Sequence, residues 1–266
     1  SALELASDRI RTFHEKQKNE SWFDAGDLGI FGQVIRPLNR VGIYTPGGSA
    51  ALPSSLLMTA VPARVAGVED IVIAAPPRGD EGVPDVILAA AAIAGVDRVF
   101  AIGGAQAIAA MAHGTESVPA VDKICGPGNI FVTVAKQQVS GTVAIDQIAG
   151  PTETLVVADD SADLELVAAD MIAQAEHDAL ASSILVTTSE RIANDIAAEL
   201  NTQAAELPRE ETIRASLQSN GVVALVDSLE AAIECANAYA PEHMCLLVED
   251  PWALVPMVRN AGGIFV

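Results

Sequence analysis

The chain contains 266 residues, of which 50% are hydrophobic and 4% aromatic, and its formal net charge is −20. This length allows a large core in one or two domains, and the composition is typical of an α/β protein, which excludes disordered and fibrous classes. The acidic charge argues against nucleic-acid binding, which needs a basic surface, and no apolar run approaches the roughly 20 residues of a membrane span.

Predicted helices and strands alternate from the N-terminus onward. The first predicted element is a polar amphipathic helix over 4–17. Residues 29–38 and 40–46 have the residue alternation of two neighbouring strands, and 54–67 form a helix with Pro62 inside it. Two strand–helix pairs follow, "DIVIAAPP" with "PDVILAAAAIAG" and "RVFAIGG" with "AQAIAAMAHG". The segment "DKICGPGN" is a further strand and turn.

A second series begins after "AIDQIAGPTE" (144–153). Its predicted strands are "TLVVAD", "SSILVTT", "GVVALVD", "MCLLVED" and "GIFV". The predicted helices between them are "ADLELVAADMIAQAEH", "ERIANDIAAEL", "LEAAIECANAYA" and "WALVPMVRNAG". Continuous apolar strands between helices indicate parallel sheets that are covered on both faces.

Two such series predict an α/β fold of two doubly wound domains with a cleft between them. We expect a first domain over 41–150 and a second over 151–266. Residues 1–40 are expected to add an N-terminal helix and strand that pack on this core. The sequence leaves open whether these residues belong to the second domain.

Three glycine-rich turns follow predicted strands of the first domain: "YTPGGS" (44–49), "GGAQA" (103–107) and "GPGN" (126–129). Parallel α/β sheets bind ligands beyond the carboxyl ends of their strands, where glycine lets backbone amides approach a phosphate. None of the turns is a G-x-G-x-x-G fingerprint, and each alone is more typical of an ordinary tight turn. The three together favour a nucleotide-like ligand bound in a non-standard way.

The stretch "AQAEHDA" (173–179) ends a predicted helix. Gln174 and His177 are three residues apart and therefore share a helix face, which is a weak metal signal because histidine is a common ligand and glutamine a poor one. The alternative is a histidine stabilised by the helix C-terminus. His14 and His113 lie on a polar helix and at a helix end, and have weaker claims.

The stretch "APEHM" (240–244) contains the strongest candidate pair on physical grounds. Glu242 can orient or activate a water, and His243 can move a proton near neutral pH. Pro241 restrains the turn before them. The alternative is an exposed pair at a helix–strand junction.

The three cysteines, Cys125, Cys235 and Cys245, form no C-x-x-C pair, and none has a basic neighbour in sequence. They are typical of reduced structural thiols rather than nucleophiles. Since the N-terminus also has no signal pattern, we expect a cytoplasmic protein.

Taken in order, "RVGIYTPGG", "GGAQAIAA", "KICGPGN", "AGPTE", "AQAEHD" and "APEHM" resemble the histidinol dehydrogenase family over nearly the whole chain. The resemblance implies two Rossmann-like domains related to the aldehyde dehydrogenase architecture, assembled as a homodimer. It also implies oxidation of L-histidinol through the aldehyde to L-histidine, with reduction of two NAD⁺ and with one zinc ion.

The resemblance assigns cofactor and substrate contacts to particular residues. Tyr44, Gln106 and Asn129 match the family's NAD contacts. Thr152 stands where the family usually has a serine that touches the substrate, so a hydroxyl is kept with one extra methyl.

The same resemblance makes Gln174 and His177 two zinc ligands that also lie against the substrate, and Glu242 and His243 the catalytic pair. His243, which also contacts the substrate, would take the hydroxyl proton as hydride leaves. Glu242 would activate the water that hydrates the aldehyde.

Family members extend beyond both ends of this chain, and the resemblance implies that a later segment supplies an aspartate ligand and a histidine ligand given by the partner subunit. We therefore expect this stretch alone to hold half a zinc site and to be inactive. The alternatives are a non-catalytic dinucleotide-binding α/β module and a zinc-dependent hydrolase with Glu242 as base.

Overall fold

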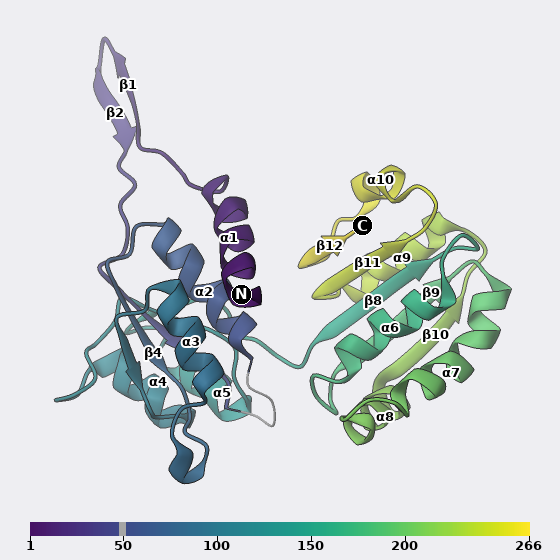
Figure 1. The fold of residues 1–266 in the computed structure, drawn as a ribbon. Coiled ribbons are helices and arrows are strands. Elements are labelled where there is room, and N and C mark those ends of the chain that lie inside the picture. The colour runs from purple at the N-terminus through teal and green to yellow at the C-terminus, as the bar shows by residue number, and fades with distance from the viewer. Residues whose placement is uncertain (48–51) are drawn as a thin grey trace. The chain divides into compact units, whose positions relative to one another are not determined.

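The computed structural model describes residues 1–47 and 52–266. They form two compact units, residues 1–150 and 151–266 (Figure 1). Each unit contains a five-stranded sheet in which every pairing is parallel. The prediction of two doubly wound parallel sheets is therefore confirmed.

The sheet of the first unit has the order β5-β4-β3-β6-β7. Its strands are β3 (Arg40–Tyr44), β4 (Asp70–Ala74), β5 (Arg98–Phe100), β6 (Lys123–Cys125) and β7 (Ala144–Ile145). Its helices are α1 (Ala2–Glu15), α2 (Pro53–Val65), α3 (Asp85–Ala94), α4 (Gly104–His113) and α5 (Ile130–Val139), with a 3₁₀ turn η1 at Gly79–Glu81.

The apolar strands of this unit are buried on both faces, which is why they read as continuous hydrophobic runs. In β4, Ile71 and Ile73 pack with α2 and α3, whereas Val72 and Ala74 pack with α4 and α5. Helix α1 adds an outer layer, since Ile10 and its apolar neighbours pack against the α2–α3 side. Among the described residues, no helix combines the length and the hydropathy that crossing a membrane requires.

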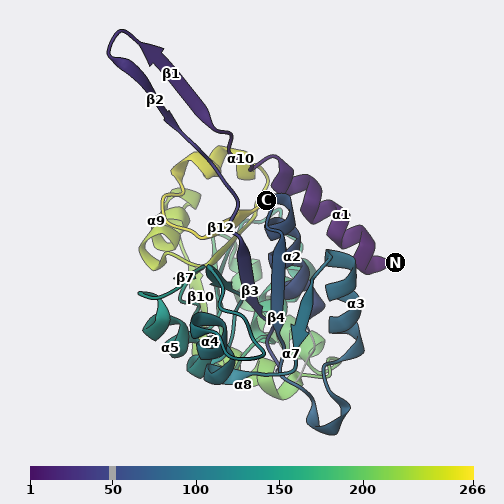
Figure 2. The same cartoon turned by 90° about the vertical axis from the view of Figure 1, so that its left-hand side faces the viewer.

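The strand predicted over 29–38 does not pair with β3. Instead, β1 (Trp22–Gly26) and β2 (Gly29–Gln33) form an antiparallel hairpin that projects from its unit in Figures 1 and 2. The predicted pairing is wrong because β4 and β6 already occupy both edges of β3. The hairpin leaves large apolar side chains such as Phe23 and Ile30 exposed.

An ion pair between a buried lysine and a half-buried aspartate holds the turn between β6 and α5. Lys136 on α5 is 2% exposed, donates from Nζ to the Gly126 carbonyl at 3.0 Å, and pairs with Asp146. The Gly126 amide donates to the same carboxylate at 2.7 Å. Gly126 has φ +108°, and a Cβ there would lie 2.2 Å from the Tyr44 carbonyl oxygen, so the turn requires glycine.

Replacing Lys136 by methionine is expected to lower the free energy of unfolding by about 2 kcal/mol, because the half-buried Asp146 carboxylate loses its charged partner. Urea denaturation measures this change. Lys18→Met, at an exposed position, is the control and should leave the free energy of unfolding nearly unchanged. Equal stabilities of the two variants would contradict the role of the ion pair.

The sheet of the second unit has the order β10-β9-β8-β11-β12. Its strands are β8 (Glu153–Ala158), β9 (Ser182–Thr187), β10 (Gly221–Leu225), β11 (His243–Leu247) and β12 (Gly263–Phe265). Its helices are α6 (Leu164–Ala175), α7 (Glu190–Ala204), α8 (Glu210–Asn220), α9 (Leu229–Tyr239) and α10 (Pro251–Leu254), followed by the 3₁₀ turn η2 (Val255–Met257).

Alternate residues of these strands again face different helices. Val156 and Cys245 pack on the side of α6, α7 and α8, whereas Leu155 and Met244 pack on the side of α9. These two faces are called the α6 face and the α9 face below.

Two helix predictions in this unit need correction. The helix predicted over 252–262 ends at Leu254 and continues only as the 3₁₀ turn η2, because Pro256 has no N–H and its ring clashes with an earlier carbonyl. Helix α8 was not predicted, since only Ile213 and Ser216 of its residues are buried and its apolar periodicity is weak.

Candidate functional site

The predicted NAD-binding residues lie at the carboxyl-terminal edge of the first sheet. Tyr44 is the last residue of β3, and its hydroxyl accepts a hydrogen bond from the Gly104 amide at 3.1 Å. This bond ties the end of β3 to the first residue of α4. Gln106 lies exposed in the first turn of α4.

Asn129 occupies the N-cap of α5, where its side-chain oxygen accepts from the Val132 amide at 3.2 Å. The edge therefore contains the N-termini of α4 and α5, which carry partial positive charge and favour anionic groups. Of the predicted turn 44–49, residues 48–49 lie outside the described residues.

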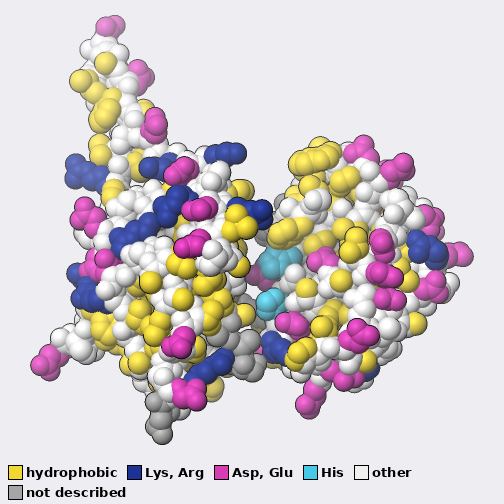
Figure 3. Space-filling view, in the orientation of Figure 1, with side chains coloured by type: hydrophobic (Ala, Val, Ile, Leu, Met, Phe, Trp, Pro, Cys, Tyr) yellow, Lys and Arg dark blue, Asp and Glu magenta, His cyan; other side chains and the backbone are white. Residues whose placement is uncertain are grey.

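The predicted substrate and catalytic residues lie at the amino-terminal edge of the second sheet. His243 is the first residue of β11, and Thr152 directly precedes β8. Gln174 is in the last turn of α6, and His177 lies in the turn that leads to β9. Histidine side chains reach the surface of this unit in Figure 3.

The sequence placed this group at the end of a helix and at a helix–strand junction, and the structure agrees. These residues follow helices and precede strands. In a doubly wound unit each helix runs back against the strands, so the ends of helices and the starts of strands share one edge.

The structure brings Gln174 and His243 together although they are 69 residues apart in sequence. The Nδ1 atom of His243 is 3.3 Å from Oε1 of Gln174. Residue 243 lies between Thr154 on β8 and Gly263 on β12 in the parallel register. The ring of Phe265 packs edge-on against the His243 ring at a centroid distance of 5.5 Å.

The turn that carries Glu242 is restrained on both sides. Ala240, which caps α9, has φ 58° and ψ 60°, and among the described residues it is the one non-glycine with positive φ. Such a conformation persists only where surrounding contacts impose it. The Gly262 and Gly263 amides donate to the carbonyls of Pro241 and Glu242 at 3.0 and 2.9 Å.

The Glu242 side chain is exposed and that of His243 is half-buried. His177 is exposed and lies just past the end of α6, where its amide donates to the Gln174 carbonyl at 3.2 Å. Gln174 and His177 offer one amide oxygen and one imidazole nitrogen. No group of three His, Cys, Asp or Glu side chains within residues 1–47 and 52–266 is placed to hold a metal ion.

Two residues near this edge were not predicted. Phe265 contacts His243 from the neighbouring strand, and Thr154, which pairs with His243 in register, has a fully buried hydroxyl without a hydrogen-bond partner. Neither residue type carries a local sequence signal, because both contacts depend on the pairing of β11 with its neighbours.

The cysteine environments disfavour nucleophilic chemistry. Burial and the charge of Asp146 raise the pKa of the Cys125 thiol to about 11, although Lys123 and Lys136 oppose this shift. Burial and the hydrogen bond and charge of Asp170 raise the pKa of Cys245 as well. Both groups therefore remain thiols at neutral pH, and thiolates are the reactive form.

We expect iodoacetamide at neutral pH to modify Cys235, which is exposed, and to leave Cys125 and Cys245 unmodified in the native chain. Peptide mass spectrometry after a short pulse measures the labelling of each site. A denatured sample, in which all three should react, is the control. Native labelling of Cys245 at the rate of Cys235 would contradict this account.

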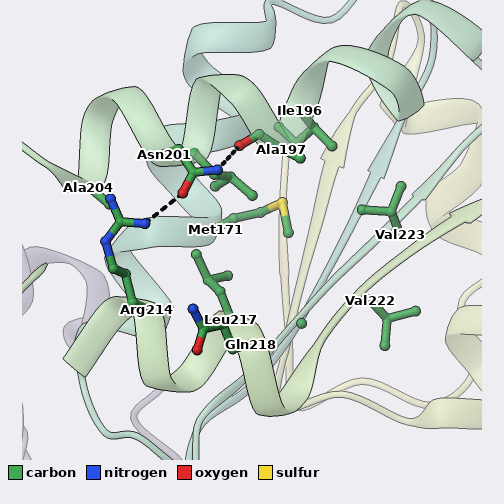
Figure 4. A pocket seen from close by; sticks show the side chains of 12 residues that line it. Met171, Ile196, Ala197, Asn201, Ala204, Arg214, Leu217, Gln218, Val222 and Val223 are labelled. Atoms are coloured by element: carbon green, nitrogen blue, oxygen red, sulfur yellow. Dashed lines mark hydrogen bonds between the residues drawn. The ribbon is translucent and has the colours of Figure 1, made fainter. Parts of the chain in front are cut away.

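A separate apolar groove of about 300 Å³ lies on the α6 face of the second unit (Figure 4). Side chains from α6, α7, α8 and β10 line it, among them Met171, Ile196, Leu200, Leu217, Val222 and Val223. Arg214 donates to Asn201 at 2.7 Å at this groove. None of the predicted site residues lines it, so we place the candidate site at the polar sheet edges.

A family model for histidinol dehydrogenase matches residues 1–266. The chain belongs to the histidinol dehydrogenase family. The histidinol dehydrogenase of Dehalococcoides mccartyi strain CBDB1 is 53% identical over 264 residues, which are 99% of this chain and 60% of that protein. The crystal structure of histidinol dehydrogenase from Elizabethkingia anophelis superposes with a TM-score of 0.94 at 39% identity, covering 99% of this chain and 61% of that chain.

The predicted family is thus confirmed, and the chain spans about three-fifths of the length of these histidinol dehydrogenases. A propionaldehyde dehydrogenase from Rhodopseudomonas palustris superposes with a TM-score of 0.56 at 15% identity, covering 96% of this chain and 75% of that chain. At this identity the likeness concerns the fold alone. The predicted aldehyde-dehydrogenase-like architecture is confirmed.

Proposed function

We propose that the natural full-length protein oxidises L-histidinol to L-histidine through the aldehyde, in two steps that each reduce one NAD⁺. Membership of the histidinol dehydrogenase family supports this reaction. The observation that carries the proposal is the contact between His243 and Gln174, because it joins the proposed base to a proposed substrate and metal ligand. A homodimer is proposed on the family resemblance.

NAD⁺ is proposed to bind at the carboxyl-terminal edge of the first sheet. The N-termini of α4 and α5 would face the pyrophosphate, with Tyr44, Gln106 and Asn129 as contacts. The bound nicotinamide would accept the hydride. Tyr44 is 4% exposed and bonded to Gly104, so its role is to hold the edge in place rather than to move with the cofactor.

Zinc is proposed on the same grounds, with Gln174 and His177 as ligands. Zinc sites typically use four donors, so these residues fit half of a site. The remaining donors would have to come from elsewhere in the natural protein.

Proton transfer can be assigned to atoms of this chain. The carboxamide oxygen of Gln174 faces Nδ1 of His243 and only accepts, so Nδ1 would carry the proton in this contact and Nε2 would keep its lone pair. Nε2 would take the carbinol proton as hydride leaves. Glu242, exposed at the same edge, would then deprotonate the water that adds to the aldehyde, and a second hydride transfer would yield the acid.

Incubation of the full-length protein with L-histidinol and NAD⁺ tests the function directly. We expect two NADH for each histidinol consumed, measured by absorbance. Cofactor binding without NADH formation would favour a non-catalytic module and would contradict the proposal.

Asn129→Ala and Asn129→Ser separate two roles of this side chain. Both variants lose the amide donor, and each should raise the KM for NAD⁺ about 10-fold, with a smaller effect on the KM for histidinol. Serine keeps an N-cap acceptor, so only alanine should also lose about 1 kcal/mol of stability in urea denaturation. A raised KM in the alanine variant alone would mean that capping of α5, and not cofactor contact, explains the effect.

A further inference from the structure

A long-range hydrogen bond joins the end of α9 to the start of β9. The hydroxyl of Tyr239, the last residue of α9, lies 2.5 Å from Oγ of Ser182, the first residue of β9. The Ser182 amide also donates to the carbonyl of Thr152 at 2.9 Å. Ser182 is therefore bonded both to the backbone of the proposed substrate contact and to the helix that precedes the proposed catalytic pair.

This bond lies on the other face of the sheet from the His243–Gln174 contact. Ile184 and Val186 lie two and four residues after Ser182 on β9, so they share its face, and they pack on the α9 face. Cys245 lies two residues after His243 on β11, so it shares the face of His243, and it packs on the α6 face. The Tyr239 hydroxyl therefore has no direct path to the reacting atoms, and its effect has to pass through the backbone.

The backbone between Tyr239 and His243 is short and already restrained at its far side. Ala240 leaves the helix in the left-handed conformation, and the amides of Gly262 and Gly263 hold the carbonyls of Pro241 and Glu242. The last turn of α9 is held on one side by Asn237, whose side-chain oxygen accepts from the Arg259 and Asn260 amides. The bond to Ser182 adds a second tie, which joins the end of this turn to β9.

We propose that the Tyr239–Ser182 hydrogen bond is a positioning device that sets where the turn delivers Glu242 and His243. This inference rests on the proposed function of that pair. Tyr239 is 36% exposed, so its hydroxyl adds little to the core and its removal should cost little stability. A displacement of the pair by a fraction of an ångström is enough to slow the chemistry, because reaction rates fall steeply with misplacement.

The test uses the full-length protein with Tyr239→Phe, Ser182→Ala, the double variant and Ser182→Thr. Each single loss of a hydroxyl should lower kcat about 10-fold, and the double variant should be no slower than either single variant. Ser182→Thr keeps the hydroxyl and should keep most of the activity. The KM for NAD⁺ and the melting temperature should stay close to the wild-type values.

Unchanged kcat in both single variants, losses that multiply in the double variant, or a loss in Ser182→Thr equal to that in Ser182→Ala would each overturn the positioning role. A lowered melting temperature with normal kcat would assign the bond to stability alone, and would overturn it too. These results leave the proposed function intact, since the wild-type protein is active in all of them. A wild-type protein without histidinol-dependent NADH formation would overturn both.

Discussion

His243→Asn is expected to lower kcat of the full-length protein by about 10²–10⁴-fold in both oxidation steps, the usual range for a general acid–base group. Asparagine cannot accept the carbinol proton near neutral pH, and both hydride transfers release a proton from an oxygen. Supplying the alcohol and the aldehyde in separate assays, with NADH as the readout, measures the two steps. His113→Asn, at an exposed position at the end of α4, is the matched control.

Glu242→Gln should slow the aldehyde-to-acid step most, by a similar factor, because glutamine keeps the shape but cannot deprotonate water. Oxidation of the alcohol should be less affected. Glu249→Gln, an exposed glutamate just beyond the opposite end of β11, is the matched control and should leave both steps unchanged. Near-normal turnover of either His243→Asn or Glu242→Gln would remove that residue from the mechanism.

Residues 1–266 expressed alone are expected to be folded, poor in zinc and without turnover. Gln174 and His177 supply two donors, of which the amide is weak, and the described residues contain no group of three His, Cys, Asp or Glu side chains placed to hold a metal ion. Residues 1–266 should therefore bind zinc more weakly than the full-length protein. The difference in affinity should exceed the ~10–100-fold loss that follows when a residue that hydrogen-bonds a zinc ligand is replaced. Each unit nonetheless contains its own sheet, covering helices and apolar core, so folding does not require the metal.

Metal analysis after dialysis, a cooperative urea transition and a histidinol-dependent NADH assay measure the three properties. The full-length protein, treated in the same way, is the control for zinc retention. Stoichiometric zinc together with turnover in residues 1–266 would mean that other side chains of this stretch complete the site.

Much of the fold was predictable because the hydrophobic pattern is local. Apolar strands such as 70–74 are buried on both faces, so their position and the parallel sheet could be inferred from the sequence. The hairpin formed by 22–33 was not, because the choice between pairing with itself and pairing with β3 depends on which strands already occupy the edges of β3.

The family could be inferred from sequence alone, since six short motifs in a fixed order are specific together. Helical spacing made Gln174 and His177 only a weak metal signal, and the resemblance made them candidate ligands. Which of these residues meet depends on the pairing of distant strands. The parallel register places the starts of β8, β9 and β11 at one edge, and this brings His243 to Gln174 and Tyr239 to Ser182 across 69 and 57 residues. Such contacts follow from backbone pairing between distant strands, which leaves no local pattern in the sequence.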